Sequence, residues 1–460
     1  MPRSFQTLSP VDGSVFVERP WAQPAELEAV LEAAAGARAG WTATPLAARI
    51  AVVESAVQWL EANSERLSAE LTQQMGRPIR YAPGEIRGTA DRARTMAALA
   101  PQALAAITPP PQAGFTRFIE RVPLGVVLVL SPWNYPWLTA VNAVVPALLA
   151  GNVVVLKHSD QTPLVAERFV EAFRAAGLPD GVFQYIHMDH DLSAAAVADT
   201  RVDFVAFTGS LAGGQAIHRA AAGSLKAIGL ELGGKDPAYV RADADLPFAI
   251  ENVVDGAFFN SGQSCCAVER VYVHRDHFDE FVAGAAELVS KYTLGDPRQQ
   301  QTTLGPVVRP RNARAIQAQI DAATAAGARP LIDAARFSGP TPAYLAPQIL
   351  VGVSHDMALM TEETFGPVLG IMPVSGDEEA IRLMNDSPYG LTASIWTADE
   401  AAAMRIGGAL QTGTVFMNRC DYLDPALAWV GVKGSGRGCT LSTVGFESLT
   451  RPKSFHLRIR

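Results

Sequence analysis

Hydrophobic and polar positions follow a helical repeat near the start of the chain. From about Pro24 to Leu104 the sequence is rich in Ala, Glu, Arg and Leu, with apolar residues three or four positions apart, as in RIAVVESAVQWLEANSERLSAELTQQMG. This spacing places the apolar side chains on one face of a helix. The pattern therefore predicts a helical opening region, which ends at Pro109, Pro110 and Pro111.

The pattern changes after these prolines. The segment FTRFIERVPLGVVLVLSPW predicts extended strands with a turn at Pro123–Gly125. Apolar runs then alternate with helical segments, in the order GVVLVLS, helix 141–150, NVVVLKHS, helix 164–176, VFQYIH, helix 193–198, DFVAFTGS and helix 213–222. Strands that are apolar throughout are typical of a parallel sheet covered on both faces. We therefore expect an α/β fold with a doubly wound nucleotide-binding domain.

A second α/β region begins at ELGGKDP, residues 231–237. There the pattern predicts a helix over 246–259, a strand over 270–274 and a βα series that continues to about Asn418. The tail from Tyr422 is rich in glycine and ends in SFHLRIR, whose alternation predicts an edge strand.

Composition and charge narrow the function classes. With 460 residues, 48% of them hydrophobic, the chain has material for two or three domains. A net charge of −8 argues against nucleic acid as a partner. No apolar run has the roughly 18 residues of a membrane span and MPRSFQTLSPVDGS lacks a signal layout, so we expect a cytoplasmic protein without membrane association. The four cysteines have neither disulfide-framework nor zinc-site spacing, so we expect reduced thiols and no metal.

One cysteine lies in a context that suits chemistry. The segment FFNSGQSCCAVER places Cys265 after a glycine-containing turn and a predicted helix. Neighbouring backbone N–H groups favour the thiolate and so lower a thiol pKa. A lone cysteine is, however, more often a small buried apolar residue. The segment by itself leaves both interpretations open.

Five motifs in a fixed order decide between these interpretations. They are SPWNYP at 131–136, FTGS at 207–210, ELGGK at 231–235, GQSC at 262–265 and EETFGPV at 362–368. In this order, and with GVKGSGRG at 431–438, they resemble the aldehyde dehydrogenase superfamily over nearly the whole chain. Each string is short, but their joint occurrence makes chance improbable.

The resemblance implies three catalytic residues. Cys265 matches the family's nucleophile, whose thiolate adds to the aldehyde carbon. Asn134 matches the side-chain amide that stabilises the resulting oxyanion together with the backbone N–H of Cys265. Glu231 matches the general base that activates water to hydrolyse the thioester. The plainer alternatives are a turn-forming asparagine and a surface glutamate.

The resemblance also implies NAD as cofactor, with NADP possible. The candidate pyrophosphate donors lie at a helix that begins near Gly213, while Asp160, three residues after Lys157, suggests that NAD is preferred. Pro132 and Trp133 could line the same cleft or belong only to the core. The candidate cofactor-binding residues are Lys157, Asp160, Gly209, Ser210, Gly214, Trp133, Pro132, Glu363 and Phe365.

The substrate side is less defined. Tyr135 and Trp429 match positions of the family's aldehyde tunnel and favour an apolar or aromatic aldehyde. Arg419 could instead bind the carboxylate of a semialdehyde acid, or pair with Asp421 or Asp424. Two departures from the family pattern are His158, whose role the sequence does not indicate, and Cys266, for which a packed small residue is preferred over a vicinal disulfide partner.

The predicted domain organisation follows the motifs. We expect a dinucleotide-binding domain over 1–114 and 124–230, a catalytic domain over 231–420, and an oligomerisation flap and tail over 115–123 and 421–460. Strand edges in the flap would pair in a homodimer or homotetramer. Coenzyme-A-acylating, phosphorylating and non-catalytic relatives remain alternatives, although Glu231 argues against the acylating type.

Overall fold

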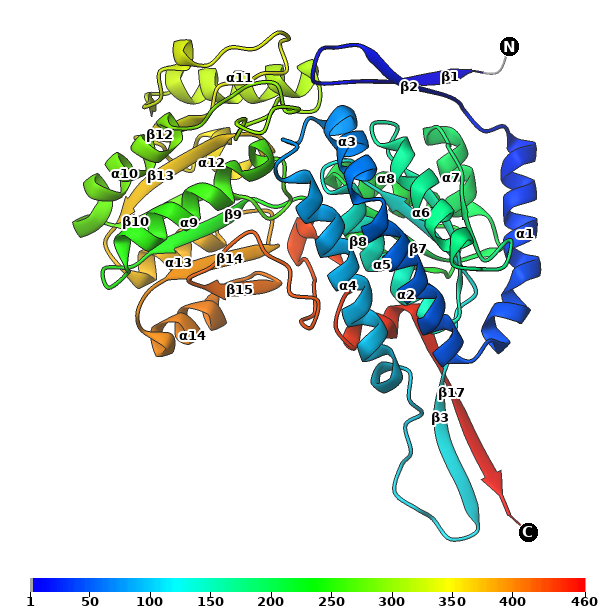
Figure 1. Cartoon of the computed structure of the whole chain (residues 1–460). Coiled ribbons are helices and arrows are strands. Elements are labelled where there is room, and N and C mark those ends of the chain that lie inside the picture. Colours follow the sequence, from blue (N-terminus) through cyan, green and yellow to red (C-terminus); the bar gives the residue numbers. More distant parts are fainter. Residues whose placement is uncertain (1–2, 460) are drawn as a thin grey trace.

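The first α/β region is built on a sheet whose strand order is β16-β8-β7-β4-β5-β6. The computed structural model describes residues 3–459 (Figure 1). The five strands β8, β7, β4, β5 and β6 run parallel to one another. At the edge of the sheet, β16 pairs with β8 in the antiparallel direction. The strands are β4 (Val126–Ser131), β5 (Val153–His158), β6 (Phe183–Tyr185), β7 (Val202–Thr208), β8 (Ala227–Glu231) and β16 (Gly436–Arg437). Because the order reverses between β4 and β7, the carboxyl ends of these two strands form a ligand-binding crevice.

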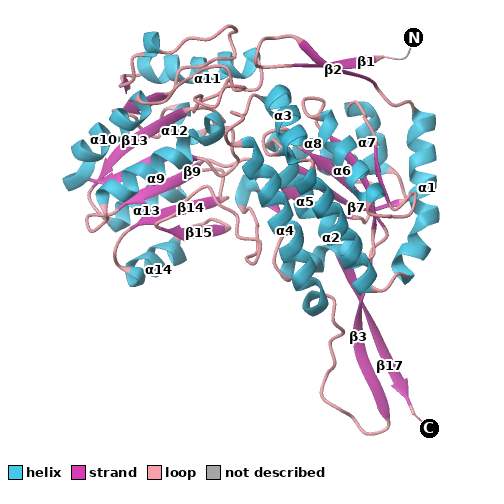
Figure 2. Ribbon diagram, in the orientation of Figure 1, coloured by secondary structure: helices cyan, strands magenta, loops and turns pink. Residues whose placement is uncertain are grey.

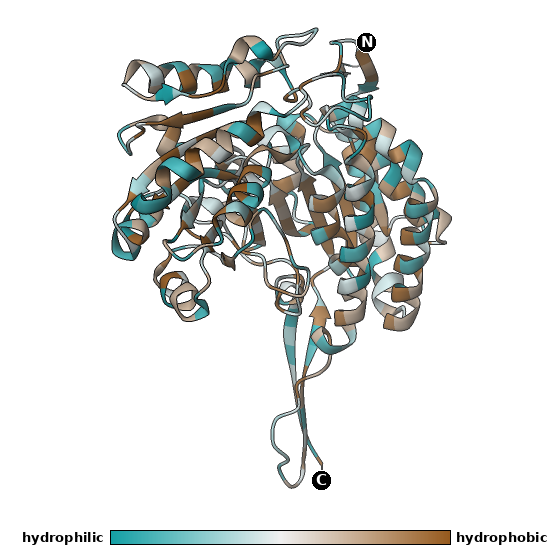
Figure 3. Ribbon diagram, turned by 60° about the vertical axis from the view of Figure 1, so that its left-hand side comes forward, coloured by the Kyte–Doolittle hydropathy of each residue, from teal (hydrophilic) through white to brown (hydrophobic). Residues whose placement is uncertain are grey.

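Helices cover both faces of this sheet, whose strands are drawn largely in brown in Figure 3 because they are apolar. The helices are α1 (Pro24–Ala43), α2 (Leu46–Ala62), α3 (Ser64–Met75), α4 (Ala82–Ala103), α5 (Pro136–Ala150), α6 (Pro163–Ala175), α7 (His190–Ala198) and α8 (Leu211–Ala221). The four helices predicted between these strands, α5 to α8, all begin earlier than the hydrophobic pattern indicated, and two of the starts have a clear cause. Pro136 at the first position starts α5, and Ser210 caps α8, so that cap chemistry rather than periodicity sets both starts.

The second α/β region has a seven-stranded sheet in the order β11-β12-β13-β10-β9-β14-β15. All pairs are parallel except β11 with β12. Separate apolar cores pack on its two faces. Its strands are β9 (Asp236–Val240), β10 (Val268–His274), β11 (Arg329–Pro330), β12 (Gln348–Val351), β13 (Val368–Val374), β14 (Thr392–Trp396) and β15 (Thr414–Met417), and its helices are α9 (Leu246–Phe258), α10 (Phe278–Ser290), α11 (Pro310–Ala325), α12 (Ala358–Thr361), α13 (Asp377–Asn385) and α14 (Glu400–Ala409).

A two-stranded antiparallel sheet projects away from the first region (Figures 1 and 2). It pairs β3 (Phe115–Pro123) with β17 (Thr450–Arg458). Phe118 lies opposite Phe455, with ring centroids 4.5 Å apart. We call this sheet the flap. A second hairpin, β1 (Ser4–Leu8) with β2 (Val15–Pro20), lies near the N-terminus.

The tail differs from the predicted boundary of 421–460. Only β17 belongs to the flap, because β16 pairs with β8 and the apolar side chains Trp429, Leu441 and Phe446 pack into the core of the first region. Residues 429–449 therefore pack as part of the first region. Alternating hydrophobicity could identify the last strand, but not which core the preceding glycine-rich loops join. None of the helices in residues 3–459 has the length and apolar character needed to cross a bilayer.

Candidate active site

A cavity of about 650 Å³ lies where the two regions meet, and both regions contribute to its wall. The loop after β4 supplies Asn134 and Tyr135, β8 ends in Glu231, and the segment after α9 supplies Cys265. Trp429 from the tail lines the same cavity. The structure thus brings together all three predicted catalytic residues and both predicted substrate residues.

The turn before Cys265 has an unusual backbone. Asn260 and Ser261 have φ angles of 54° and 57°, and Gly262 follows at 69°. Non-glycine residues rarely adopt this left-handed region, so the turn is held by its surroundings. Cys265 follows the carboxyl end of α9 and no helix begins at it. A helix N-terminus therefore does not contribute to the predicted stabilisation of the Cys265 thiolate by neighbouring N–H groups.

The Asn134 side chain is fixed from two directions. Its Nδ2 donates to the Gln263 carbonyl at 3.2 Å, which leaves the second amide hydrogen for an oxyanion. Its main-chain oxygen accepts from Arg77 at 2.7 Å and from Asn260 at 3.2 Å. Arg77 is buried in an ion pair with Glu85. The loop that carries Asn134 is thus tied both to α4 and to the turn before Cys265.

Glu231 is half-buried at the end of β8. Burial raises its pKa, while hydrogen bonds from Thr440 and from Thr208 (3.3 Å) oppose that rise. The elevation suits a group that must take a proton near neutral pH. The two glycines that follow Glu231 in the motif pack closely, because a side chain at Gly233 would overlap the Glu363 carboxylate and one at Gly234 the Cys265 carbonyl.

Two charged groups in the cofactor crevice have few protein partners. Lys157, at the end of β5, donates to no group in residues 3–459, and burial lowers its pKa. Glu363 accepts one hydrogen bond, from the Gly234 N–H at 3.1 Å, and burial beside Glu269 raises its pKa to about 8. A lysine and a carboxylate with unused bonding capacity fit the hydroxyl groups of two ribose rings. The residues present therefore fit a dinucleotide.

A buried ion pair lies next to the residues that were predicted to hold the nicotinamide. Lys235 and Glu269 are 0% and 3% exposed, with Nζ and Oε2 2.6 Å apart. Glu269 also accepts the backbone N–H groups of Thr364 and Phe365, each at 2.8 Å. Phe365 in turn packs edge-on against Trp133, with centroids 5.6 Å apart. The pair thus positions the predicted ring-binding residues, and the sequence did not indicate this role for either member.

The glycines at the start of α8 have different roles from those predicted. The Gly209 N–H donates to the Glu231 carbonyl at 3.0 Å, and Ser210 caps the Gly213 N–H at 3.2 Å. Gly214 is buried against Leu232. Since the first N–H groups of a helix have no intrahelical partner, those of Leu211 and Ala212 are the donors left for a pyrophosphate.

Asp160 does not present a free carboxylate. Its Oδ1 lies 2.8 Å from Nη2 of Arg309, a residue of the second region, so the group predicted to bind the ribose is held in an ion pair. Its neighbour His158 is buried and hydrogen-bonds the Pro136 carbonyl and Thr162. Burial lowers its pKa to about 3. His158 therefore acts as a neutral link between β5 and the start of α5.

On the substrate side of the cavity, Arg419 does not pair with a neighbouring carboxylate. Arg419 is exposed and lies 3.4 Å from the Tyr422 ring centroid; no ion pair with Asp421 or Asp424 forms. Asp421 instead accepts from Ser264 at 2.7 Å and from the Cys266 thiol at 3.2 Å. Cys266 is buried, as expected of a packed small residue, and all four cysteines are free thiols. Within residues 3–459, no three His, Cys, Asp or Glu side chains gather as a metal site would require.

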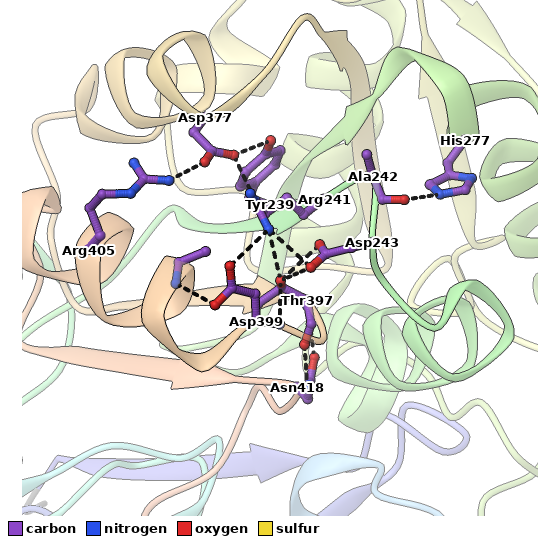
Figure 4. Close-up of polar contacts among 11 residues, drawn as sticks. Tyr239, Arg241, Ala242, Asp243, His277, Asp377, Thr397, Asp399, Arg405 and Asn418 are labelled. Carbon is purple, nitrogen blue, oxygen red and sulfur yellow. Dashed lines mark hydrogen bonds and ion pairs between the residues drawn. The ribbon is translucent and has the colours of Figure 1, made fainter.

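The carboxyl ends of the second sheet lie away from this chemistry and carry a separate polar network (Figure 4). Arg241 pairs with Asp243 and Asp377, both at 3.0 Å, and Arg405 also pairs with Asp377. Every arginine in this network has a carboxylate partner. We interpret it as a brace between β9, α13 and α14.

The amino-acid sequence matches the aldehyde dehydrogenase family over residues 1–455. The chain belongs to the aldehyde dehydrogenase family. Its relatives include a succinate semialdehyde dehydrogenase [NAD(P)+] of Escherichia coli, 34% identical over 445 residues that cover 96% of this chain and 95% of that protein. A 3,6-anhydro-alpha-L-galactose dehydrogenase of Streptomyces coelicolor is 34% identical over 458 residues, which cover 98% of this chain and 92% of that protein.

Solved structures of aldehyde dehydrogenases share this architecture. An NADP-dependent glyceraldehyde-3-phosphate dehydrogenase from Bacillus halodurans, complexed with NADP, superposes with a TM-score of 0.94 at 34% identity, covering 100% of this chain and 96% of that one. An indole-3-acetaldehyde dehydrogenase complexed with NAD+ superposes with a TM-score of 0.95 at 32% identity, covering 99% of this chain and 93% of that one. The predicted family, α/β fold class and NAD(P)-dependent oxidation of aldehydes are confirmed.

Proposed function

We propose that this aldehyde dehydrogenase converts an aldehyde to a carboxylic acid through a thioester on Cys265. The observation that carries the proposal is the convergence of Cys265, Asn134 and Glu231 on one cavity. The Cys265 thiolate adds to the aldehyde carbon, and the oxyanion accepts hydrogen bonds from the free Nδ2 hydrogen of Asn134 and the Cys265 N–H. Bound NAD(P) supplies the hydride acceptor.

Hydrolysis of the thioester falls to Glu231. The carboxylate takes a proton from a water molecule, the water oxygen bonds to the acyl carbon, and the carbon–sulfur bond breaks to return Cys265. The same base argues against a coenzyme-A-acylating enzyme. The presence of all three catalytic residues argues against a non-catalytic protein on the same fold.

Turnover of an aldehyde panel tests this proposal. We expect NADH or NADPH formation without coenzyme A or inorganic phosphate, and its complete loss in Cys265→Ala. A strict requirement for coenzyme A would favour the acylating alternative, and one for phosphate the phosphorylating alternative. Activity retained by Cys265→Ala would contradict the thioester route.

We further propose a homodimer or homotetramer assembled through the flap. Most residues of β17 are exposed and most of β3 are only half-buried, and an isolated two-stranded sheet is only marginally stable in water. A second copy that paired with this edge would remove the unsatisfied hydrogen-bonding groups. Light scattering that gave a monodisperse monomer at working concentration would contradict this. The four free thiols agree with the cytoplasm as the proposed location.

A further inference from the structure

Arg92 lies on α4 in the wall of the catalytic cavity and has no carboxylate partner among residues 3–459. Its Nη1 donates to the Leu138 carbonyl at 2.9 Å and to Oδ1 of Asn142 at 3.2 Å. A guanidinium carries five N–H groups, of which Nη1 supplies two. The three on Nε and Nη2 therefore have no acceptor in the described chain.

Three other enclosed arginines have direct partners, whereas the buried Nε of Arg49, which does not line this cavity, has none in residues 3–459. Arg77 is paired with Glu85, Arg241 with Asp377 (Figure 4), and Arg270 donates to the carbonyls of Leu383 and Met384. Withdrawing a charge from water is costly unless a partner compensates. Burial lowers the pKa of Arg92, but a guanidinium stays charged at neutral pH. Arg92 thus keeps a positive charge in the wall of the catalytic cavity without a carboxylate in direct contact.

The acidic groups of the cavity do not neutralise Arg92 by contact. Glu231 is held by Thr440 and Thr208, and Asp421 by Ser264 and Cys266. Asp91 and Asp255 also line the cavity and are exposed to solvent. The free edge formed by Nε and Nη2 matches the two oxygens of one carboxylate.

We propose that Arg92 binds a carboxylate at the far end of the substrate, so that the preferred substrates are aldehyde acids. This inference rests on the proposed function, because the aldehyde end must reach Cys265 while the carboxylate meets Arg92. A phosphate dianion would call for a second cation, and the other arginine of the lining, Arg419, lies over the Tyr422 ring. A carboxylate therefore fits better than a phosphate.

The test compares aldehydes of matched length. kcat/KM is measured for 4-oxobutanoate, butanal and glyceraldehyde 3-phosphate in the parent, Arg92→Met and Arg92→Lys. We expect the parent to favour 4-oxobutanoate over butanal by about 10- to 100-fold, the range of a charge-assisted hydrogen-bond pair. Arg92→Met should lose that ratio, chiefly through KM, and Arg92→Lys should recover part of it. Arg87→Met, an exposed arginine on the same helix, is the matched control and should keep the ratio.

Several outcomes would overturn the assignment. If the parent enzyme has a higher kcat/KM for butanal or for glyceraldehyde 3-phosphate than for 4-oxobutanoate, Arg92 does not form a carboxylate site. An equal loss for 4-oxobutanoate and butanal in Arg92→Met means that the guanidinium acts through Glu231, whose pKa it lowers.

A binding measurement separates this inference from the proposed function. Succinate carries carboxylates but no aldehyde, so it should raise the melting temperature of the parent and of Arg87→Met but not that of Arg92→Met. If no aldehyde is oxidised while succinate still discriminates in this way, the proposed function fails and the anion site stands. If succinate stabilises all three proteins equally or none of them, the anion site fails.

Discussion

Replacing Glu231 by glutamine should separate the two halves of the reaction. Glutamine keeps the shape of the side chain and can still accept from Thr440, but it cannot take a proton from water. Loss of a general base slows the step that it serves by about 100- to 10,000-fold. Acylation does not need this base if Cys265 reacts as a thiolate. Hydrolysis should therefore become rate-limiting.

The size of the effect can be worked out from these rates. If hydrolysis becomes 100-fold slower than hydride transfer, the first turnover should release about 0.98 NADH per active site, the square of 100/101, before the steady state. The steady-state kcat should fall by at least about 100-fold if hydrolysis limits the parent enzyme. Cys265 should then carry the acyl group for most of the cycle.

Stopped-flow NADH absorbance gives the burst, and intact-mass measurement gives the acyl adduct. Glu231→Asp, which restores a carboxylate one methylene shorter, is the matched variant and should recover part of the turnover without the full burst. Unchanged turnover in Glu231→Gln would show that another group activates the water. A lost burst without an adduct would place Glu231 in acylation instead.

Three further substitutions test neighbouring contacts. Thr440→Val removes a hydrogen bond to the charged form of Glu231, so the pKa of Glu231 should rise and the acidic limb of the kcat profile should shift up by about one pH unit, whereas Thr440→Ser should leave it in place. Asp160→Ser should lower the NAD-to-NADP ratio of kcat/KM by about tenfold, because it removes a carboxylate that would repel the 2′-phosphate and releases Arg309 to bind it; an unchanged ratio would remove Asp160 as the discriminator. The pKa of Glu363 is about 8 in the folded chain against 4.5 normally, so folding takes up a proton and stability should fall as pH rises from about 4.5 to 8, by up to about 5 kcal/mol. Thermal melts of Glu363→Gln should show a flatter pH dependence over this range, and a parallel curve would contradict the cause.

The hydrophobic pattern was sufficient to predict the strands and helices whose formation depends on residues close together in the sequence. Runs such as VVLVLS and VVVLKH are apolar on both faces, so only a sheet covered on both sides can bury them. The strand-like pattern of 115–123 and of the C-terminal segment SFHLRIR also indicated strands, and the structure pairs Phe115–Pro123 with Thr450–Arg458. Helix starts were less accurate, since periodicity does not detect a cap such as Ser210.

The candidate site was predictable only where a motif carried it. Cys265, Asn134 and Glu231 each lie in a short string typical of the family. Arg77 gave no such signal, because its partners Asn134 and Asn260 are 57 and 183 residues away. Arg309 likewise meets Asp160 across 149 residues, which altered the expected role of that carboxylate.

The sequence by itself determined the order of the elements, the class of chemistry and the identity of the reacting side chains. Each of these follows from residue type and spacing over a few positions, which a linear pattern records. Only the tertiary structure decided which charges lie together. Thr440 reaches Glu231 across 209 residues, and Arg92 faces the cavity without a carboxylate partner in residues 3–459. Burial and charge pairing depend on groups that converge from distant segments, and these set the pKa of Glu231 and the charge presented to the substrate.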